Sequence, residues 1–203
     1  MKNTIIVATG NAHKVTEMAA ILSGVKDIEL VTMRDAGVTG DIEENGTTFE
    51  ENAKIKARTV AKLTGKPAIA DDSGLSVDAL GGAPGIYSAR YASMDGGNAS
   101  DQANIDKLLD ELKLIPSGER TARFVSAIAL VFPDGREYCT LGVCEGVITS
   151  EMRGNGGFGY DPVFYSLALS KTFGEATADE KNSISHRNRA LEQLKVLLKD
   201  IEF

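Results

Sequence analysis

Two pairs of neighbouring carboxylates are the residues in this sequence with the clearest capacity for metal chemistry. Glu43 and Glu44 precede an Asn-Gly dipeptide, and Asp71 and Asp72 follow a short apolar run. Consecutive carboxylates at the end of a strand suit a solvated loop or a bound cation, and their hard oxygen atoms are ligands that Mg²⁺ prefers. Adjacent side chains of an extended chain point in opposite directions, so we expect only one of Asp71 and Asp72 to face such a site.

A glycine turn between a predicted strand and a predicted helix is a candidate phosphate site. It consists of Thr9, Gly10, Asn11, Ala12, His13 and Lys14. Backbone N–H groups at the start of a helix attract anions, and Lys14 adds a mobile positive charge. The turn lacks the Gly-x-x-x-x-Gly-Lys pattern, so it is not a P-loop. A plain strand-to-helix turn is the alternative interpretation.

A second glycine-rich segment, residues 154–159, formally fits the pattern Gly-x-Gly-x-x-Gly. Asp161 and Pro162 prevent a helix from starting there in the usual way, so the strand–turn–helix context of a dinucleotide site is missing. What remains is a close approach of the backbone with two aromatic rings. Phe158 and Tyr160 can stack on a base, and Asp161 can accept a hydrogen bond from a base N–H. A glycine hairpin with core aromatics is the alternative.

Positive side chains are expected at the start of the last predicted helix. Ser185 is a natural N-cap for that helix, and His186 and Arg187 follow it, shortly after Lys181. The helix dipole makes cations unfavourable at this end, and a sequence that breaks a local rule often does so for function. These side chains are hydrogen-bond donors, and an oxo group on a purine is an acceptor.

The elements that must position these residues alternate between strand and helix and then become antiparallel. Short apolar runs rich in β-branched residues predict strands, and apolar residues at i, i+3, i+4 and i+7 predict helices. The predicted strands cover residues 4–8, 28–33, 68–70, 122–132 and 137–148. The predicted helices cover residues 14–22, 47–63, 101–114 and 185–199. Asp134-Gly135 between the last two strands indicates a hairpin. The pattern predicts an α/β fold with a mixed sheet flanked by helices.

The composition narrows the class of protein. The chain has 203 residues, of which 42% are hydrophobic and 25% charged, as in an ordinary globular protein of one large domain or two joined lobes. A net charge of −7 argues against a nucleic-acid partner, although a few local cations and a bound metal can still hold a triphosphate. The apolar run near the N-terminus is too short for a signal peptide or a membrane span, so we expect a cytoplasmic protein without a membrane partner.

Six segments occur in an order that resembles the inosine triphosphate pyrophosphatase family. They are ATGNAHK, EENGTTFEENA, ADDSGLSVDALGGAPGIYSARYA, RTARF, GGFGYDPVF and DEKNSISHR. The resemblance implies an elongated mixed β-sheet flanked by helices, with residues 1–203 forming a single domain of two lobes and a central cleft. It also implies Mg²⁺ as cofactor and a homodimer.

The resemblance implies a role for each matching residue. The segment from Thr9 to Lys14 resembles the triphosphate-binding loop. Glu43 and Asp72 match Mg²⁺ ligands, Asp72 also matches the general base, and Ser73 matches a substrate contact. The resemblance implies a base pocket formed by Phe158, Gly159, Tyr160 and Asp161. It implies contacts with the base and its oxygen for Lys181, His186 and Arg187.

The activity that the resemblance implies is hydrolysis of non-standard purine nucleoside triphosphates. ITP, dITP and XTP would be split into the nucleoside monophosphate and pyrophosphate, with attack at the α-phosphorus. One alternative is a pyrophosphatase for another modified or pyrimidine triphosphate. Another is a nucleotide-binding protein without turnover, against which the presence of Glu43, Asp72 and Lys14 argues.

Overall fold

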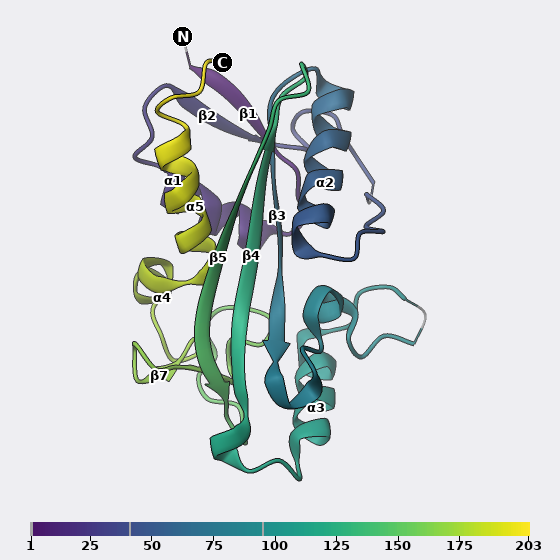
Figure 1. Cartoon of the computed structure of the whole chain (residues 1–203), viewed down its shortest axis with the longest axis vertical. Coiled ribbons are helices and arrows are strands. Elements are labelled where there is room, and N and C mark those ends of the chain that lie inside the picture. The colour runs from purple at the N-terminus through teal and green to yellow at the C-terminus, as the bar shows by residue number, and fades with distance from the viewer. Residues whose placement is uncertain (1, 41, 95) are drawn as a thin grey trace. The chain divides into compact units, whose positions relative to one another are not determined.

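The computed structural model describes residues 2–40, 42–94 and 96–203, and within them it forms a mixed sheet with helices (Figure 1). The strands are β1 (Asn3–Val7), β2 (Ile28–Thr32), β3 (Ala68–Val77), β4 (Thr121–Val131), β5 (Glu137–Ile148), β6 (Phe164–Ser166) and β7 (Lys171–Thr172). Their order in the sheet is β2-β1-β3-β4-β5-β6-β7. β1 runs parallel to β2 and β3, whereas β6 runs antiparallel to β5 and β7. The predicted α/β class with a mixed sheet is confirmed.

The helices agree with the predicted ones to within a few residues, and one was not predicted. They are α1 (Ala12–Leu22), α2 (Phe49–Thr64), α3 (Asp101–Leu112), α4 (Ala178–Ile184) and α5 (His186–Leu197), with short 3₁₀ helices η1 (Asp78–Leu80), η2 (Gly85–Arg90) and η3 (Ser117–Glu119). α4 is the unpredicted helix. Ser185 lies between α4 and α5, and α5 begins at His186, so His186 and Arg187 do open the last helix as predicted.

The described chain divides into two compact units. Unit 1 contains the residues up to Asp72 together with Ser126–Gly142 and Arg187–Phe203. Unit 2 contains Ser73–Val125 and Val143–His186. β3, β4 and β5 therefore each contribute residues to both units. The prediction of a single domain with a cleft between two lobes concerns the arrangement of the units and stays a prediction.

The sheet of unit 1 is covered by helices on both faces, because its strands are apolar on both sides. Ile5 and Val7 of β1 pack in one buried cluster with α1 and α5. Ile6 and Ala8 point the other way and pack in a second cluster with α2. Alternation along a strand requires this division. Figure 1 shows α2 on one side of these strands and α1 and α5 on the other.

Unit 2 has a separate core, in which several aromatic rings pack among aliphatic side chains. α3 packs against residues of β3, β4 and β5 in one buried cluster. The rings of Phe124, Phe164 and Phe173 meet in this cluster, with centroids 4.6 Å apart for Phe124–Phe164 and 5.1 Å apart for Phe164–Phe173. Such tilted aromatic contacts link β4, β6 and the residue after β7.

The predicted hairpin between β4 and β5 is confirmed. Phe132 N donates to Arg136 O at 2.9 Å, and Gly135 N donates to Phe132 O at 3.0 Å. Gly135 has a φ of 93°, a backbone conformation that residues with a Cβ rarely adopt. The glycine of the Asp-Gly pair is therefore what lets the turn close.

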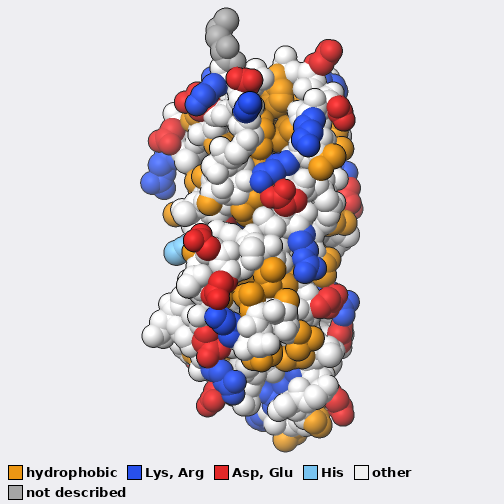
Figure 2. All heavy atoms as spheres, turned by 90° about the vertical axis from the view of Figure 1, so that its left-hand side faces the viewer, with side chains coloured by type: hydrophobic (Ala, Val, Ile, Leu, Met, Phe, Trp, Pro, Cys, Tyr) orange, Lys and Arg blue, Asp and Glu red, His pale blue; other side chains and the backbone are white. Residues whose placement is uncertain are grey.

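One face of the molecule carries charges of both signs close together. On the face shown in Figure 2, lysine and arginine side chains are interspersed with aspartate and glutamate. Among the described residues, no helix has the length and apolar character needed to cross a membrane.

Candidate active site

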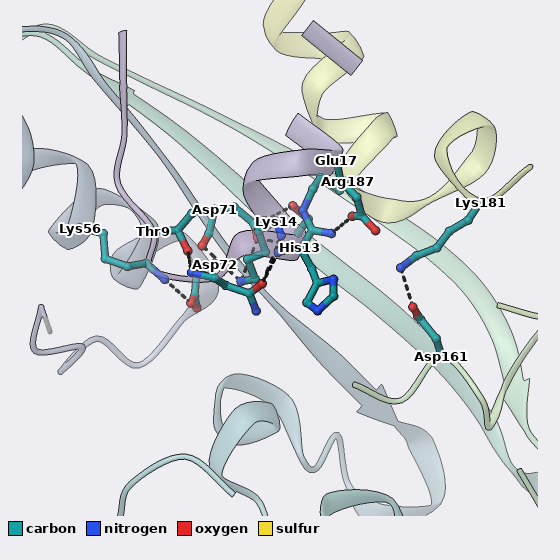
Figure 3. Close-up of polar contacts among 12 residues, drawn as sticks. Thr9, His13, Lys14, Glu17, Lys56, Asp71, Asp72, Asp161, Lys181 and Arg187 are labelled. Atoms are coloured by element: carbon teal, nitrogen blue, oxygen red, sulfur yellow. Dashed lines mark hydrogen bonds and ion pairs between the residues drawn. The ribbon is translucent and has the colours of Figure 1, made fainter. Parts of the chain in front are cut away.

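Asp71 and Asp72 sit next to each other on β3 and face opposite sides of the sheet of unit 1. Asp71 pairs with Lys14 of α1 and with Arg187 of α5, on the face that those two helices cover. Asp72 pairs with Lys56 of α2, on the other face. The predicted alternation is thus confirmed, and the two carboxylates have different surroundings. Figure 3 shows these ion pairs.

The carboxylate of Asp71 joins three elements and is fully buried. Ser126 Oγ of β4 donates to Oδ1 at 2.6 Å. Lys14 Nζ and an Arg187 N–H group contact Oδ2 at 2.9 Å and 2.8 Å, and Arg187 also pairs with Glu17. Burial alone would raise the pKa of Asp71, but the positive charges of Arg187 and Lys14 hold this pKa well below its usual range. Asp71 is therefore ionised at neutral pH, where it anchors two cations.

Lys14 carries a charge that its surroundings only partly compensate. Burial lowers the pKa of its ammonium group, and the nearby positive charges of Lys56 and Arg187 act in the same direction. The negative charge of Asp71 opposes them, but the pKa remains below its ordinary value. An additional anion beside Lys14 would favour its charged form. This makes Lys14 a suitable contact for a phosphate group.

The turn before α1 uses three of its N–H groups internally. Asn11 is the N-cap, and its Oδ1 accepts hydrogen bonds from the N–H groups of His13 and Lys14 at 2.9 Å and 3.2 Å. Thr9 Oγ1 in turn accepts one from Asn11 N at 3.2 Å. Residues 10–13 are exposed. Binding of a phosphate by the segment from Thr9 to Lys14 stays a prediction. The Lys14 ammonium and the Asn11 amide nitrogen are two side-chain donors that the cap does not use.

Asp72 shares one lysine with Glu44. Lys56 Nζ lies 2.8 Å from Asp72 Oδ1 and 3.2 Å from Glu44 Oε1. Burial raises the pKa of Asp72 to about 6 despite the positive charge of Lys56. Burial also opposes ionisation of Glu44, but Lys56 and a hydrogen bond with the Asp72 carboxyl bring the pKa of Glu44 below its ordinary value. Of the two carboxyls, Asp72 is thus the one that takes up a proton near neutral pH.

The Glu44–Asp72 pair has the donor set of a Mg²⁺ site. Asp72 Oδ2 is buried, and no hydrogen-bond donor within the described ranges reaches it. Two carboxyls close enough to share a proton can share a cation instead, and Mg²⁺ binds through one or two carboxylates together with waters and substrate phosphates. The described part of the chain contains no group of three or more His, Cys, Asp or Glu residues that could hold a metal ion, so a cation here would have two protein carboxyls as ligands. The two carboxyls therefore fit a divalent cation, and waters or phosphate oxygens would complete its coordination.

Glu43 and Glu44 occupy different environments. Glu43 is exposed, whereas Glu44 is half-buried and reaches Lys56. The assignment of Glu43 as a metal ligand stays a prediction, and Glu44 is the residue that the structure brings to Asp72. Glu43 and Glu44 are adjacent and identical, so the sequence alone does not distinguish their surroundings.

Lys56 was not singled out in the sequence, although a signal was present. It lies on the face of α2 that also buries Asn52, Ala53, Ala57 and Val60. Lysine is almost never buried without a partner, so a lysine on the apolar face of an amphipathic helix indicates a buried carboxylate opposite.

The predicted base-pocket residues of unit 2 include a buried ion pair beside an aromatic ring. Lys181 Nζ lies 2.6 Å from Asp161 Oδ2 (Figure 3). The same nitrogen lies 4.5 Å from the centroid of the Phe158 ring. Asp161 Oδ2 also accepts a hydrogen bond from Phe158 N at 2.9 Å. A Cβ at Gly157 would lie 2.0 Å from the same oxygen, so this glycine permits the contact. The structure therefore brings Phe158, Asp161 and Lys181 together.

Three other predicted residues of unit 2 contact neighbouring residues of the unit through hydrogen bonds or ring stacking. The Tyr160 ring is buried in the core of the unit, and its hydroxyl donates to Ser88 O at 2.9 Å. Gly159 N donates to Asp101 Oδ2 at 2.7 Å. The His186 ring stacks on Phe124 with centroids 4.8 Å apart. Of the two rings proposed to stack on a base, Phe158 is the more accessible one.

Ser73 and Arg187 lie directly after Asp72 and His186 in the chain. Ser73 is half-buried on β3. Arg187 is buried and paired with Asp71 and Glu17, which are two partners that the sequence did not indicate. Contacts of Ser73 with substrate and of Arg187 with a base stay predictions.

The raised pKa of Asp72 predicts a pH dependence of activity. If Asp72 is the base, only its carboxylate form is competent, so kcat/KM should fall about tenfold per pH unit below pH 6 and level off above it. Steady-state kinetics from pH 5 to 9 at constant ionic strength would measure this. A profile without a limb near pH 6 at any cation concentration would contradict the assignment.

Comparison with known proteins identifies the chain in two steps. The fold and site define an α/β protein with two features of a phosphate-processing enzyme. The carboxyls of Asp72 and Glu44 suit a divalent cation, and the ammonium group of Lys14 suits a phosphate. The model of the Ham1 family matches residues 5–197. The dITP/XTP pyrophosphatase of Leuconostoc mesenteroides is 50% identical to this chain over 192 residues, which cover 94% of each protein. The dITP/XTP pyrophosphatase of Shigella flexneri is 53% identical over 194 residues, which cover 94% of this chain and 95% of the relative.

A solved structure agrees with this relationship. The HAM1 protein from Coxiella burnetii superposes with a TM-score of 0.87 at 44% identity, covering 98% of this chain and all of that one. The chain belongs to the Ham1 family. The family resemblance predicted from the six ordered segments is confirmed.

Proposed function

We propose that this protein hydrolyses ITP, dITP and XTP to the nucleoside monophosphate and pyrophosphate, with Mg²⁺ as cofactor. The observation that carries the proposal is the buried Asp72, whose raised pKa suits a base and whose carboxyl adjoins Glu44 and Lys56. Pyrophosphatase activity on dITP and XTP is named for relatives that match this chain along almost its entire length. The reaction would remove non-standard purine nucleotides from the nucleotide pool.

In the proposed reaction the chain supplies a base and positive charge. Mg²⁺, held by Asp72 with Glu44 or Glu43, would neutralise charge on the phosphate oxygens. Asp72 accepts a proton from the attacking water as the water oxygen bonds to the α-phosphorus. The bond from that phosphorus to the bridging oxygen breaks, and pyrophosphate leaves. Lys14 contacts the phosphates, and Lys56 holds Asp72 in its orientation.

Selection of the base would rest on residues predicted to meet its edge. Phe158 would stack on the ring, and Lys181, His186 and Arg187 would supply donors to the oxygen at position 6. Hypoxanthine and xanthine present an acceptor there, whereas adenine presents an amino donor. An unpaired buried donor costs about 1–3 kcal/mol, or roughly 10- to 100-fold in kcat/KM per group. ATP should therefore be the poorer substrate.

We also propose a cytoplasmic homodimer. The proposed action on the pool of free nucleotides favours this compartment, and the resemblance of the motifs to a family of homodimers supports the assembly. Light scattering on the purified protein should give twice the chain mass of 21.6 kDa.

The proposed activity is tested by product analysis with ITP, XTP, GTP and ATP in the presence of Mg²⁺. We expect IMP and pyrophosphate from ITP, with slower turnover of GTP and ATP. Diphosphate and free phosphate would mean attack at the γ-phosphorus and would refute the mechanism. A lack of turnover with all four would favour the alternative, and a panel of pyrimidine and modified-base triphosphates would then identify the substrate.

A further inference from the structure

Asn52 is a fully buried polar residue on α2 that the proposed mechanism does not use. It has no exposed surface, and its Oδ1 accepts a hydrogen bond from Gly46 N at 2.8 Å. Its Nδ2 is buried without a hydrogen-bond partner in the described part of the chain. A buried donor without a hydrogen bond destabilises the folded state, so an apolar side chain at this position would destabilise it less. The bond to Gly46 is the contact that distinguishes asparagine from such a residue.

The neighbouring residue Glu51 makes a parallel contact. Its carboxylate accepts hydrogen bonds from Thr47 N at 2.6 Å and from Thr47 Oγ1 at 2.9 Å. A Cβ at Gly46 would lie 2.7 Å from both Asn52 Oδ1 and Glu51 Cβ, so the backbone touches the helix there. Two successive side chains of α2 thus hold two successive residues of the preceding segment.

This contact fixes the stretch of chain that carries Glu44. Glu44 lies two residues before Gly46, and its carboxylate reaches Lys56 at 3.2 Å. Lys56 follows Asn52 by four residues and so lies one turn further along the same face of α2. One helix face therefore supplies both the anchor of the segment and the lysine that meets the carboxylate.

We infer that Asn52 is a positioning residue for the divalent-cation site, because its bond to Gly46 sets where the Glu44 carboxylate lies beside Asp72. The inference deepens the proposed function and rests on it for the identity of the site. Loss of the bond lets the segment around Gly46 move and separates the two carboxyls. Residues that orient metal ligands typically change metal affinity by about 10- to 100-fold when they are removed.

The test measures cation binding in the full-length protein without nucleotide, with Mn²⁺ as the probe and electron paramagnetic resonance as the readout. We expect Asn52→Ala to weaken Mn²⁺ binding about tenfold. Gly46→Ala disturbs the same contact from the loop side and should also weaken Mn²⁺ binding. If Asn52→Ala does not fold, Gly46→Ala tests the inference in its place. Amide hydrogen exchange at Gly46 should be faster in Asn52→Ala than in the wild type.

Asn104 provides a matched control. It is also a buried helical asparagine, and its Oδ1 accepts from Ala92 N at 2.8 Å while its Nδ2 donates to Ala89 O, all within unit 2. Asn104→Ala should lower the melting temperature and leave Mn²⁺ affinity unchanged. The inference is wrong if Asn52→Ala and Gly46→Ala both retain wild-type affinity, if Asn104→Ala weakens binding equally, or if the wild type binds no Mn²⁺. Product analysis of the wild type tests the proposed function separately.

Discussion

Replacing Asp72 by asparagine is expected to reduce turnover of ITP by about 10²- to 10⁴-fold, because the amide cannot accept the proton of the attacking water. Asparagine has nearly the same shape, so nucleotide binding should persist. Single-turnover kinetics would measure the chemical step, and equilibrium binding of ITP in the presence of Ca²⁺ would measure affinity. A variant that hydrolyses ITP at the wild-type rate would show that Asp72 is not the base.

The thermal stability of Asp72→Asn shows whether its loss of turnover comes from the missing base or from misfolding. The pKa of Asp72 is raised by burial from 3.8 to about 6 in the folded protein, so the folded state prefers the protonated side chain. Its contribution to stability is fully present below about pH 4 and is lost as the pH rises through 6. At pH 8 the uncharged amide that Asp72→Asn introduces should therefore leave the melting temperature unchanged or higher. Asp134→Asn, at the exposed β4–β5 turn, is the control and should retain full turnover.

The local parts of the site could be predicted because they depend on residues close in sequence. The glycine turn before α1 follows from an apolar run, a glycine and an amphipathic helix, and Asn11 caps that helix. The opposite orientation of Asp71 and Asp72 follows from the pleat of a single strand. The β4–β5 hairpin follows from its Asp-Gly pair. Each of these features involves a few successive residues and one geometric rule.

The partners of the charged residues could not be predicted, because they are distant in the sequence. Asp71 meets Ser126 and Arg187 across separations of 55 and 116 residues. The sequence shows that Arg187 breaks the rule for helix starts, but not that a carboxylate of another strand compensates its charge. Tyr160 illustrates a further limit, since its pattern fits a base contact and a core ring equally well and only the fold shows that it is buried.

Asp71 is the residue whose charge we expect to matter most for stability. Asp71→Asn keeps the size of the side chain but removes the anion that Lys14 and Arg187 share. Arg187 retains Glu17, whereas Lys14 loses the partner that lies closest to it. Removing one partner from a buried ion pair typically costs about 3–5 kcal/mol, because the other charge stays buried without compensation. Denaturation by urea at pH 7.5 would measure the loss.

The pH dependence of stability provides an independent check of this argument. Because the pKa of Asp71 lies well below 3.8 in the folded protein, its stabilising contribution is present above about pH 4 and is lost as the pH falls toward the folded value. The difference in stability between the wild type and Asp71→Asn should therefore shrink below pH 4. Asp78→Asn breaks the exposed Asp78–Arg123 pair and should cost less than about 1 kcal/mol. Equal losses for the two variants at pH 7.5 would mean that the burial of Asp71 adds nothing, and that Lys14 and Arg187 find other compensation when it is removed.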